Sequence, residues 1–413
     1  MYDGIAQRIS ALEAAYGDFP LISAAWSDIH ENSLQDSELT VNLVKHFDFW
    51  ETFLTTNKIQ LLVIDVPSIT STTVAWIVCQ KLGVHYTSFV DIAPLGTQLV
   101  VTSSWQGHYD QLPSALERAQ RTGVDKTSDS YSKAVQYAHR MKTHPTKTAE
   151  SVNKLQSEQF SHIPFHLIKK IPGFLTRERI RRQYYMRSGG TGWFLQWLKA
   201  YKNHWYHKYI NVFEDYKANE QSRYFLFPLH ERGEWSNYTW MGLKYGDLLA
   251  QIREISACLP LGRELFVKEH PLGFKKRPTS FYRTLKSMRA VRLINPHADS
   301  FNLIRGAEGV VTLGSTMGWE AWVMGRPTIL LGDPWYSYCP NIYRAHNSED
   351  LARLLQTASK LPVATEEDVV MLVTILYDIS FKAYEFPHVN TLQPDNILKW
   401  AQALNQKIST LES

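Results

Sequence analysis

Four strand-like runs in the second half of this 413-residue chain each end in residues that can hold or react with a ligand. The runs cover residues 224–229, 265–268, 291–294 and 310–313. The residues that end or follow them are His230, Glu231, Lys268, His270, Pro271, Asn295, Gly314, Ser315 and Thr316, with Glu320 a turn further into the next helix. Because ligands bind at the carboxyl ends of strands in open parallel sheets, we expect these residues to line one site.

The turn Gly314-Ser315-Thr316 is the most informative of these strand ends. It separates a buried strand from a helical run that Gly325 and Pro327 stop, and a second apolar run follows at 328–331. The start of a helix presents N–H groups and a positive dipole end, which suit a phosphate. The same hydroxyls stand where an N-cap belongs, so the turn can equally be an ordinary helix start. We expect both roles: capping when the site is empty and phosphate contact when it is filled.

His270 is the best single candidate for chemistry. An imidazole held in place by the following Pro271 can donate to a phosphate oxygen or support a leaving group. A lone histidine is more often structural, but here its neighbours at the other strand ends favour a functional role. Glu320 can accept hydrogen bonds from ribose hydroxyls, and its alternative role is a charge that complements the helix dipole.

Two carboxylates in the first half also follow strand-like runs. Asp65 comes after the run 59–64 and Asp91 after the run 84–90. Each can act as a base or nucleophile towards a sugar, and each can instead form a turn or cap a helix. The sequence leaves these alternatives open for both residues.

The elements that must position these residues alternate between strand and helix in both halves. In the first half, residues 5–16, 39–57 and 69–82 are typical of helices, whereas 20–25, 59–65 and 84–90 are typical of strands. Continuous apolar strands alternating with helices predict an α/β fold with parallel sheets. Residues 112–216 lack strand signals and predict a helical insert. We therefore expect a first domain over 1–220 that contains this insert, a second domain over 221–390, and a C-terminal helix over 391–413 that crosses back to the first.

Composition and absent motifs exclude several functions. A net charge of +4 is too small to indicate nucleic-acid binding, and the three cysteines lack metal-site spacing. No GxxxxGK[ST], strand-linked GxGxxG or GxSxG motif occurs, which argues against P-loop NTPases, dinucleotide oxidoreductases and serine hydrolases. No Asp-x-Asp pair occurs, so we expect no metal. No apolar run is long enough to span a membrane and the start lacks a secretory pattern, so we expect a cytoplasmic protein.

One basic and aromatic stretch, residues 168–187, can lie on the anionic lipid surface at the inner face of the cytoplasmic membrane. Its alternative is a solvated helix face that packs through its aromatic residues, which is the commoner role of such charge runs. His204 and His207 have helical spacing but no third ligand, so we interpret them as structural.

Three segments together carry a resemblance to a known family. They are KEHP at 268–271, the strand end at Asn295, and GSTMGWEAWVMGRPTILLG at 314–332. They resemble the nucleotide-binding half of GT-B glycosyltransferases, and within these the bacterial capsule polysaccharide synthesis family that includes the β-Kdo transferases. FPLH at 227–230 is similar to that family's Pro-Leu-Gln strand, with His230 in place of the glutamine.

The resemblance implies two Rossmann-like domains facing a central cleft, with donor nucleotide on the second domain and acceptor on the first. It also implies that His270 and the Ser315-Thr316 turn hold the donor phosphate without a metal, that Glu320 lies near the ribose, and that a carboxylate of the first domain, Asp91 or Asp65, acts on the sugar.

The resulting hypothesis is a glycosyltransferase that moves a sugar, with Kdo or another acidic sugar on a CMP donor favoured, to a surface-polysaccharide or glycolipid acceptor. No cofactor beyond the nucleotide-sugar donor is expected. Two alternatives remain: a sugar-nucleotide 2-epimerase of the same architecture, which needs no acceptor, and an inactive GT-B scaffold that binds glycan or protein partners. Fold analogy alone does not decide between them.

Overall fold

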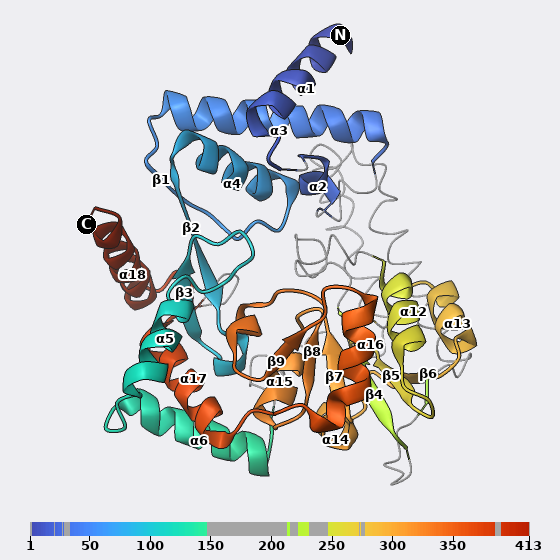
Figure 1. Ribbon diagram of the computed structural model, residues 1–413. Helices are drawn as coiled ribbons and strands as arrows, with labels where there is room; N and C mark the ends of the chain where they lie inside the picture. Colours follow the sequence, from blue (N-terminus) through green and yellow to red (C-terminus); the bar gives the residue numbers. More distant parts are fainter. Residues whose placement is uncertain are drawn as a thin grey trace, which may run out of the picture.

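The computed structural model has two β-sheets, which lie one above the other in Figure 1. It describes residues 2–19, 21–26, 28, 34–146, 213–214, 222–230, 247–271, 273, 277–384 and 390–412. Glu231, the basic stretch 168–187, the pair His204 and His207, and the predicted domain boundary at 220 lie outside the described residues.

The second sheet has six parallel strands in the order β6-β5-β4-β7-β8-β9. The strands are β4 (Tyr224–Pro228), β5 (Glu264–Lys268), β6 (Val291–Ile294), β7 (Gly309–Thr312), β8 (Thr328–Leu330) and β9 (Ile342–Arg344). Renumbered from one, this order is 3-2-1-4-5-6, the doubly wound arrangement of dinucleotide-binding folds. The predicted α/β class with a parallel sheet is therefore confirmed for this half.

Helices cover both faces of the second sheet because its strands are apolar on both sides. The helices are α12 (Leu248–Cys258), α13 (Thr279–Ser287), α14 (Ser300–Gly306), α15 (Thr316–Val323), α16 (Ser348–Thr357) and α17 (Glu366–Asp378). Residues such as Phe225 and Val311 pack against α12, α13 and α16, whereas their neighbours Leu226 and Val310 pack against α14, α15 and α17. This alternation is the expected consequence of the twofold period of a strand.

The first sheet is mixed, with the order β1-β2-β3-β10. Its strands are β1 (Leu61–Val63), β2 (His85–Asp91), β3 (Gln98–Thr102) and β10 (Phe381–Lys382). β1 and β2 are parallel, but β3 runs antiparallel to both β2 and β10. The prediction of a fully parallel first sheet is wrong. Only six residues, 92–97, join β2 to β3, and a parallel crossover needs about a dozen or more.

The predicted strand over 20–25 is also wrong, because Leu21–Trp26 forms helix α2. Its sequence LISAAW contains two alanines, and Ala24 and Ala25 are buried in the core of the first half. The other helices of this region are α1 (Tyr2–Tyr16), α3 (Asp36–Thr56) and α4 (Thr70–Leu82), and they surround a core of Phe47, Leu54 and Val78.

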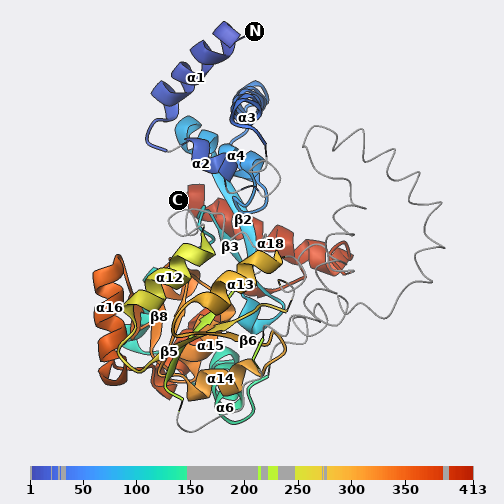
Figure 2. The same cartoon turned by 90° about the vertical axis from the view of Figure 1, so that its right-hand side faces the viewer.

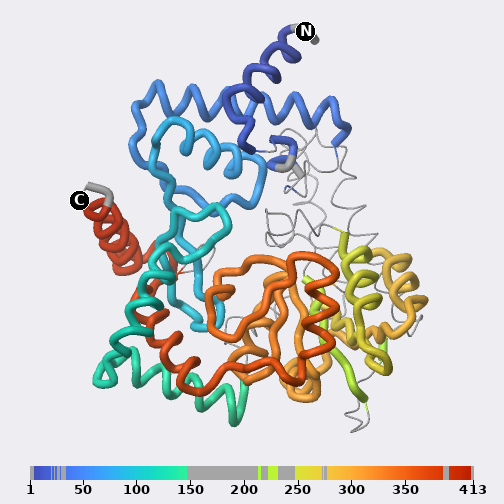
Figure 3. Tube along the Cα trace, in the orientation of Figure 1, coloured from blue at the N-terminus to red at the C-terminus, as the bar shows by residue number. Residues whose placement is uncertain are grey.

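Helices α5 (Leu112–Thr122) and α6 (Asp129–Thr143) both pack against α17, and α6 also packs against α15, although both precede the second sheet in sequence. Their buried residues share one core with α15 and α17, and in Figure 3 the segment lies beside α17. The indole N–H of Trp319 on α15 donates to the Tyr137 hydroxyl on α6 at 2.8 Å. The last helix, α18 (Pro394–Glu412), returns to the first sheet (Figure 2). There the Trp400 and Phe89 rings lie 4.4 Å apart.

Within the described part of the chain, no helix is long and apolar enough to cross a membrane.

Candidate functional site

Four of the predicted strand ends lie side by side in the second sheet. Asn295 follows β6, His270 follows β5, His230 follows β4 and Gly314 follows β7, and these strands are consecutive neighbours in the sheet. Because all four are parallel, their carboxyl ends share one edge. The strand order reverses between β4 and β7, and such a switch point is where doubly wound sheets bind ligands. The structure thus brings together the strand ends that the sequence singled out, and their role in donor binding stays a prediction.

The turn between β7 and α15 is organised by the Thr312 hydroxyl. This oxygen accepts hydrogen bonds from the N–H groups of Gly314 at 3.3 Å and Ser315 at 3.1 Å, and it donates to the Ser315 hydroxyl at 3.1 Å. Ser315 occupies the N-cap position, but its side chain makes no cap hydrogen bond. The predicted capping role of Ser315 is therefore wrong. Thr316, the first residue of α15, is exposed.

A second contact fixes the same turn from the loop after β8. The Tyr336 hydroxyl, in the short helix η3 (Trp335–Tyr338), donates to the Ser315 carbonyl at 2.6 Å. Gly318 on α15 allows this approach, because a Cβ there would lie 2.5 Å from the Tyr336 hydroxyl oxygen and 2.7 Å from Thr312 Cγ2. The Thr312 and Tyr336 hydroxyls thus hold the turn in one shape, and the Ser315 hydroxyl does not cap the helix.

A buried ion pair ties the ends of β4 and β5 together. The Glu269 side chain is fully buried and accepts from Arg277 Nε at 3.0 Å, from the Tyr282 hydroxyl at 2.6 Å and from the His270 N–H at 2.6 Å. Arg277, which is 4% exposed, also donates to the His230 carbonyl. One carboxylate–guanidinium pair therefore fixes the backbone at both candidate histidines.

Burial and charge act in opposite directions on Glu269. Complete burial raises the pKa of its carboxyl group, while the Arg277 guanidinium and the donors Tyr282 and His270 N–H oppose that rise. This network was not predicted from the sequence. Glu269 follows the strand β5 and precedes His270, so a carboxylate at a buried strand end could have indicated a buried counter-ion, but no spacing rule identified Arg277.

Lys268 and Asn295 contact the turn after β6. Lys268 is 4% exposed and its ammonium donates to the Pro296 carbonyl at 2.9 Å, while the Asn295 side-chain oxygen accepts from the His297 N–H at 2.9 Å. Both contacts order the turn, and donor binding by these residues stays a prediction. Pro271, and Glu320 on α15, are half-buried.

The two candidate carboxylates of the first half differ in their surroundings, although both are exposed. Asp65 lies in the loop after β1, and its side chain accepts from the Val66 N–H at 2.8 Å, as in a turn-forming aspartate. Asp91 is the last residue of β2, and its carbonyl accepts from the Tyr109 hydroxyl at 3.2 Å. The contact of Asp65 with its neighbour agrees with a role in forming the turn. The contact of Asp91 with Tyr109 instead connects it with residues that contact the second sheet.

Contacts of the loop after β3, which contains Tyr109, connect the Asp91 backbone with the second sheet. The Tyr109 ring stacks on Trp335 of η3 with ring centres 4.9 Å apart, and the neighbouring His108 Nε2 lies 2.7 Å from the Asp333 carbonyl after β8. Asp333 in turn pairs with Arg344 at the end of β9 at 3.2 Å. Since Tyr336 in the same short helix holds the Ser315 turn, a continuous set of contacts joins Asp91 to the candidate site.

Among the described residues, no group of three or more His, Cys, Asp or Glu side chains could hold a metal ion. The expectation of a metal-independent site stays a prediction.

The model of the family described as "Capsule polysaccharide biosynthesis protein" matches residues 119–352. The chain belongs to this family. The match begins within α5 and ends within α16, so it covers the whole strand-end site together with helix α6, which packs against α15 and α17. The family resemblance inferred from the residues is confirmed. No curated protein sequence matches the chain.

Solved structures with a similar chain path include two transferases and an epimerase. The β-Kdo 2,4 transferase and the β-Kdo 2,7 transferase of KpsC from Thermosulfurimonas dismutans are 15% and 14% identical, with TM-scores of 0.38 and 0.34. Alignment with the first covers 76% of this chain and 78% of that chain, and alignment with the second covers 82% and 83%. UDP-GlcNAc 2-epimerase from Methanocaldococcus jannaschii is 15% identical, covers 84% of this chain and 82% of its own, and has a TM-score of 0.31.

Proposed function

We propose that this protein is a glycosyltransferase of capsule biosynthesis that moves a sugar from a nucleotide-sugar donor to a surface-polysaccharide or glycolipid acceptor. The observation that carries the proposal is the set of four strand ends, followed by His230, His270, Asn295 and the turn Gly314-Ser315-Thr316, at the switch point of a six-stranded parallel sheet in a chain of the capsule polysaccharide biosynthesis family. In doubly wound parallel sheets, nucleotides usually bind at such a switch point.

In the proposed site the donor phosphate lies at the start of α15. The Ser315 hydroxyl makes no cap hydrogen bond, so it can donate to a phosphate oxygen without a loss of helix capping. The positive end of the helix dipole and the His270 side chain neutralise the phosphate in place of a metal ion. Glu320, a turn further along the same helix, accepts from ribose hydroxyls.

Asp91 is the proposed carboxylate that acts on the sugar or the acceptor. Its contact with Tyr109, and through it with the loop after β8, supports Asp91 over Asp65. A carboxylate in this role either removes the acceptor proton or attacks the sugar carbon, and the stereochemistry of the product distinguishes these two. The acceptor then approaches from the first half of the chain.

We propose a CMP-linked acidic sugar such as Kdo as donor, and a cytoplasmic protein that contacts anionic lipid at the inner membrane face through residues 168–187. The direct test incubates the full chain with CMP-Kdo and a Kdo-terminated glycolipid and follows the acceptor by mass spectrometry. We expect an acceptor heavier by one sugar, and Asp91→Asn to abolish the product while Asp65→Asn retains it. No product with any nucleotide sugar, or a donor altered without an acceptor, contradicts the proposal.

A further inference from the structure

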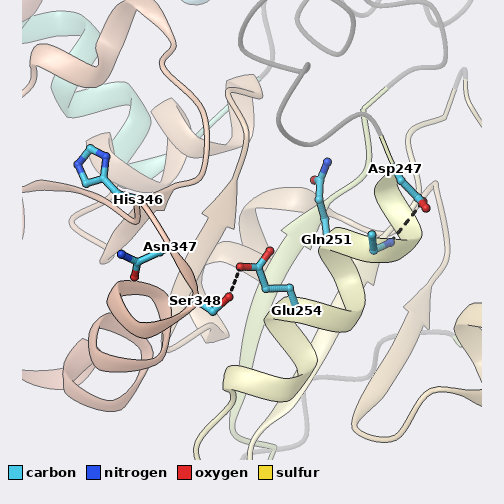
Figure 4. A pocket seen from close by; sticks show the side chains of 7 residues that line it. Asp247, Gln251, Glu254, His346, Asn347 and Ser348 are labelled. Carbon is cyan, nitrogen blue, oxygen red and sulfur yellow. Dashed lines mark hydrogen bonds between the residues drawn. The ribbon is translucent and has the colours of Figure 1, made fainter.

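A pocket of about 360 Å³ opens between α12 and the turn that begins α16. This is near the lower end of the range of small-molecule sites, roughly 300–1,000 Å³. Figure 4 shows Gln251 and Glu254 projecting from α12 on one side and the turn His346–Asn347–Ser348 on the other. α12 follows β4 and α16 follows β9, so both helices start at the sheet edge that carries the strand-end site. Neither Gln251 nor Glu254 belongs to that site.

The Gln251 side chain is the unusual group in this pocket. It is 2% exposed, yet neither its amide nitrogen nor its carbonyl oxygen has a hydrogen-bond partner among the described residues. A buried amide without partners is costly, and such groups are rare in folded proteins. Because Gln251 lines the pocket, a ligand there can supply one acceptor for its nitrogen and one donor for its oxygen.

The other polar groups of the pocket are mostly committed to the protein. Asp247 accepts from the N–H groups of Leu249 and Ala250 as the N-cap of α12, and Asn347 accepts from the Asp350 N–H as the N-cap of α16. The Ser348 hydroxyl donates to Glu254 Oε1 at 2.6 Å. The second carboxylate oxygen of Glu254 remains able to accept from a ligand.

The charge of the lining restricts the ligand. Two carboxylates, Asp247 and Glu254, line the pocket, and among the described lining residues His346 alone can carry a positive charge. An anionic ligand would meet these carboxylates, and the two helix starts are already capped by side chains. A simple cation would pair with Glu254 but leave the Gln251 N–H₂ without an acceptor. A hydroxyl group both donates and accepts, so adjacent hydroxyls satisfy Gln251 and Glu254 together.

We propose that this pocket binds a neutral, hydroxyl-rich ligand of the size of one sugar ring, held by the Gln251 amide and the Glu254 carboxylate. The described residues that line the pocket are not among those that end the strands of the strand-end site, and the proposal does not depend on glycosyl transfer.

The test uses saturation-transfer NMR on the full chain with three matched probes: methyl β-D-glucopyranoside, D-glucosamine and D-glucuronate. We expect transfer to the neutral glycoside to exceed that to either charged sugar. Gln251→Leu should abolish the signal and Glu254→Gln should reduce it, whereas Arg253→Ala, an exposed residue of the same helix outside the pocket, should leave it unchanged. No transfer to the neutral glycoside, or a signal unchanged in Gln251→Leu because the sugar binds elsewhere, overturns the proposal.

Thermal unfolding without ligand supplies an independent readout. Replacing an unpartnered buried amide by leucine removes a desolvation penalty, so Gln251→Leu should raise the melting temperature of the ligand-free protein. A lower melting temperature would show that the amide already has partners in solution, which also overturns the proposal.

Discussion

The Glu269–Arg277 pair offers a way to separate the stability of the fold from the positioning of the candidate histidines. We consider three variants: Glu269→Leu, Arg277→Met and the double variant. Each single change leaves one buried charge without its partner, since Glu269 is fully buried and Arg277 is 4% exposed. Breaking a buried pair in this way costs about 3–5 kcal/mol of the free energy of unfolding.

The double variant replaces both charges by apolar groups of similar size, and such replacements are often neutral or stabilising by about 1–4 kcal/mol. Here the Tyr282 hydroxyl also loses its 2.6 Å contact with Glu269, which costs about 1–3 kcal/mol. We therefore expect the double variant to lie within about 2 kcal/mol of the wild type, well above either single variant. Urea denaturation of all four proteins measures these differences.

Nucleotide affinity should respond differently from stability. The double variant keeps a folded core but no longer holds the His230 carbonyl or the His270 N–H, so we expect CMP to bind at least tenfold more weakly, about 1.4 kcal/mol. The matched control is Arg292→Met, which breaks an exposed pair with Glu264 in the same sheet and should cost only about 0–1 kcal/mol without an effect on CMP. The reasoning is refuted if the double variant binds CMP as the wild type does, or if it is as unstable as the single variants.

Three further predictions concern the same site. Ser315→Ala should reduce CMP affinity about tenfold in calorimetry. Because Ser315 is not a cap, the variant should lose less unfolding free energy in urea denaturation than the roughly 1 kcal/mol that a lost N-cap costs. A loss of that size together with unchanged CMP affinity would contradict the prediction. Gly318→Ala should destabilise by about 1–3 kcal/mol because its Cβ meets the Tyr336 hydroxyl, whereas Gly4→Ala, with nothing within 4 Å, should be neutral or slightly stabilising in the same denaturation assay. The pKa of Glu269 lies above its usual value of 4.5, so its contribution to stability is complete below that value and is lost as pH rises through the folded pKa. The difference in unfolding free energy between wild type and Glu269→Gln should accordingly fall as the pH rises above 4.5, by at most about 1.4 kcal/mol per pH unit, and a difference that grows with pH would show the opposite shift.

The strand ends of the second sheet were predictable from the sequence because each feature is local. A short strand-like run followed by His230, His270, Asn295 or Gly314 is visible within a few residues, and the parallel arrangement then places these ends at one edge. The first sheet was harder to predict. The strand β3 lies only six residues beyond β2, and β10 pairs with β3 from almost the other end of the chain, so neither follows from an alternating strand–helix pattern.

The contacts that hold the site could not be predicted, because they depend on distances across the fold. Arg277 contacts Glu269, eight residues before it, and His230, 47 residues before it, and a buried ion pair has no sequence period that would reveal it. The same holds for Tyr336, which contacts Ser315 from the loop after the next strand. Ser315 shows the limit of a local rule: its residue type and position predict a cap, but the nearby Thr312 hydroxyl binds it instead.

The central claim is that the strand ends around His270 form a nucleotide site. Its most direct test is a thermal-shift titration of the full chain with CMP, UDP and GDP, using wild type, His270→Ala and, as a control, Asp65→Asn. A nucleotide that binds only the folded state raises the melting temperature by mass action. We predict that CMP raises the melting temperature of the wild type and of Asp65→Asn, and not that of His270→Ala. If no nucleotide stabilises the wild type, or if His270→Ala responds equally, the claim is contradicted.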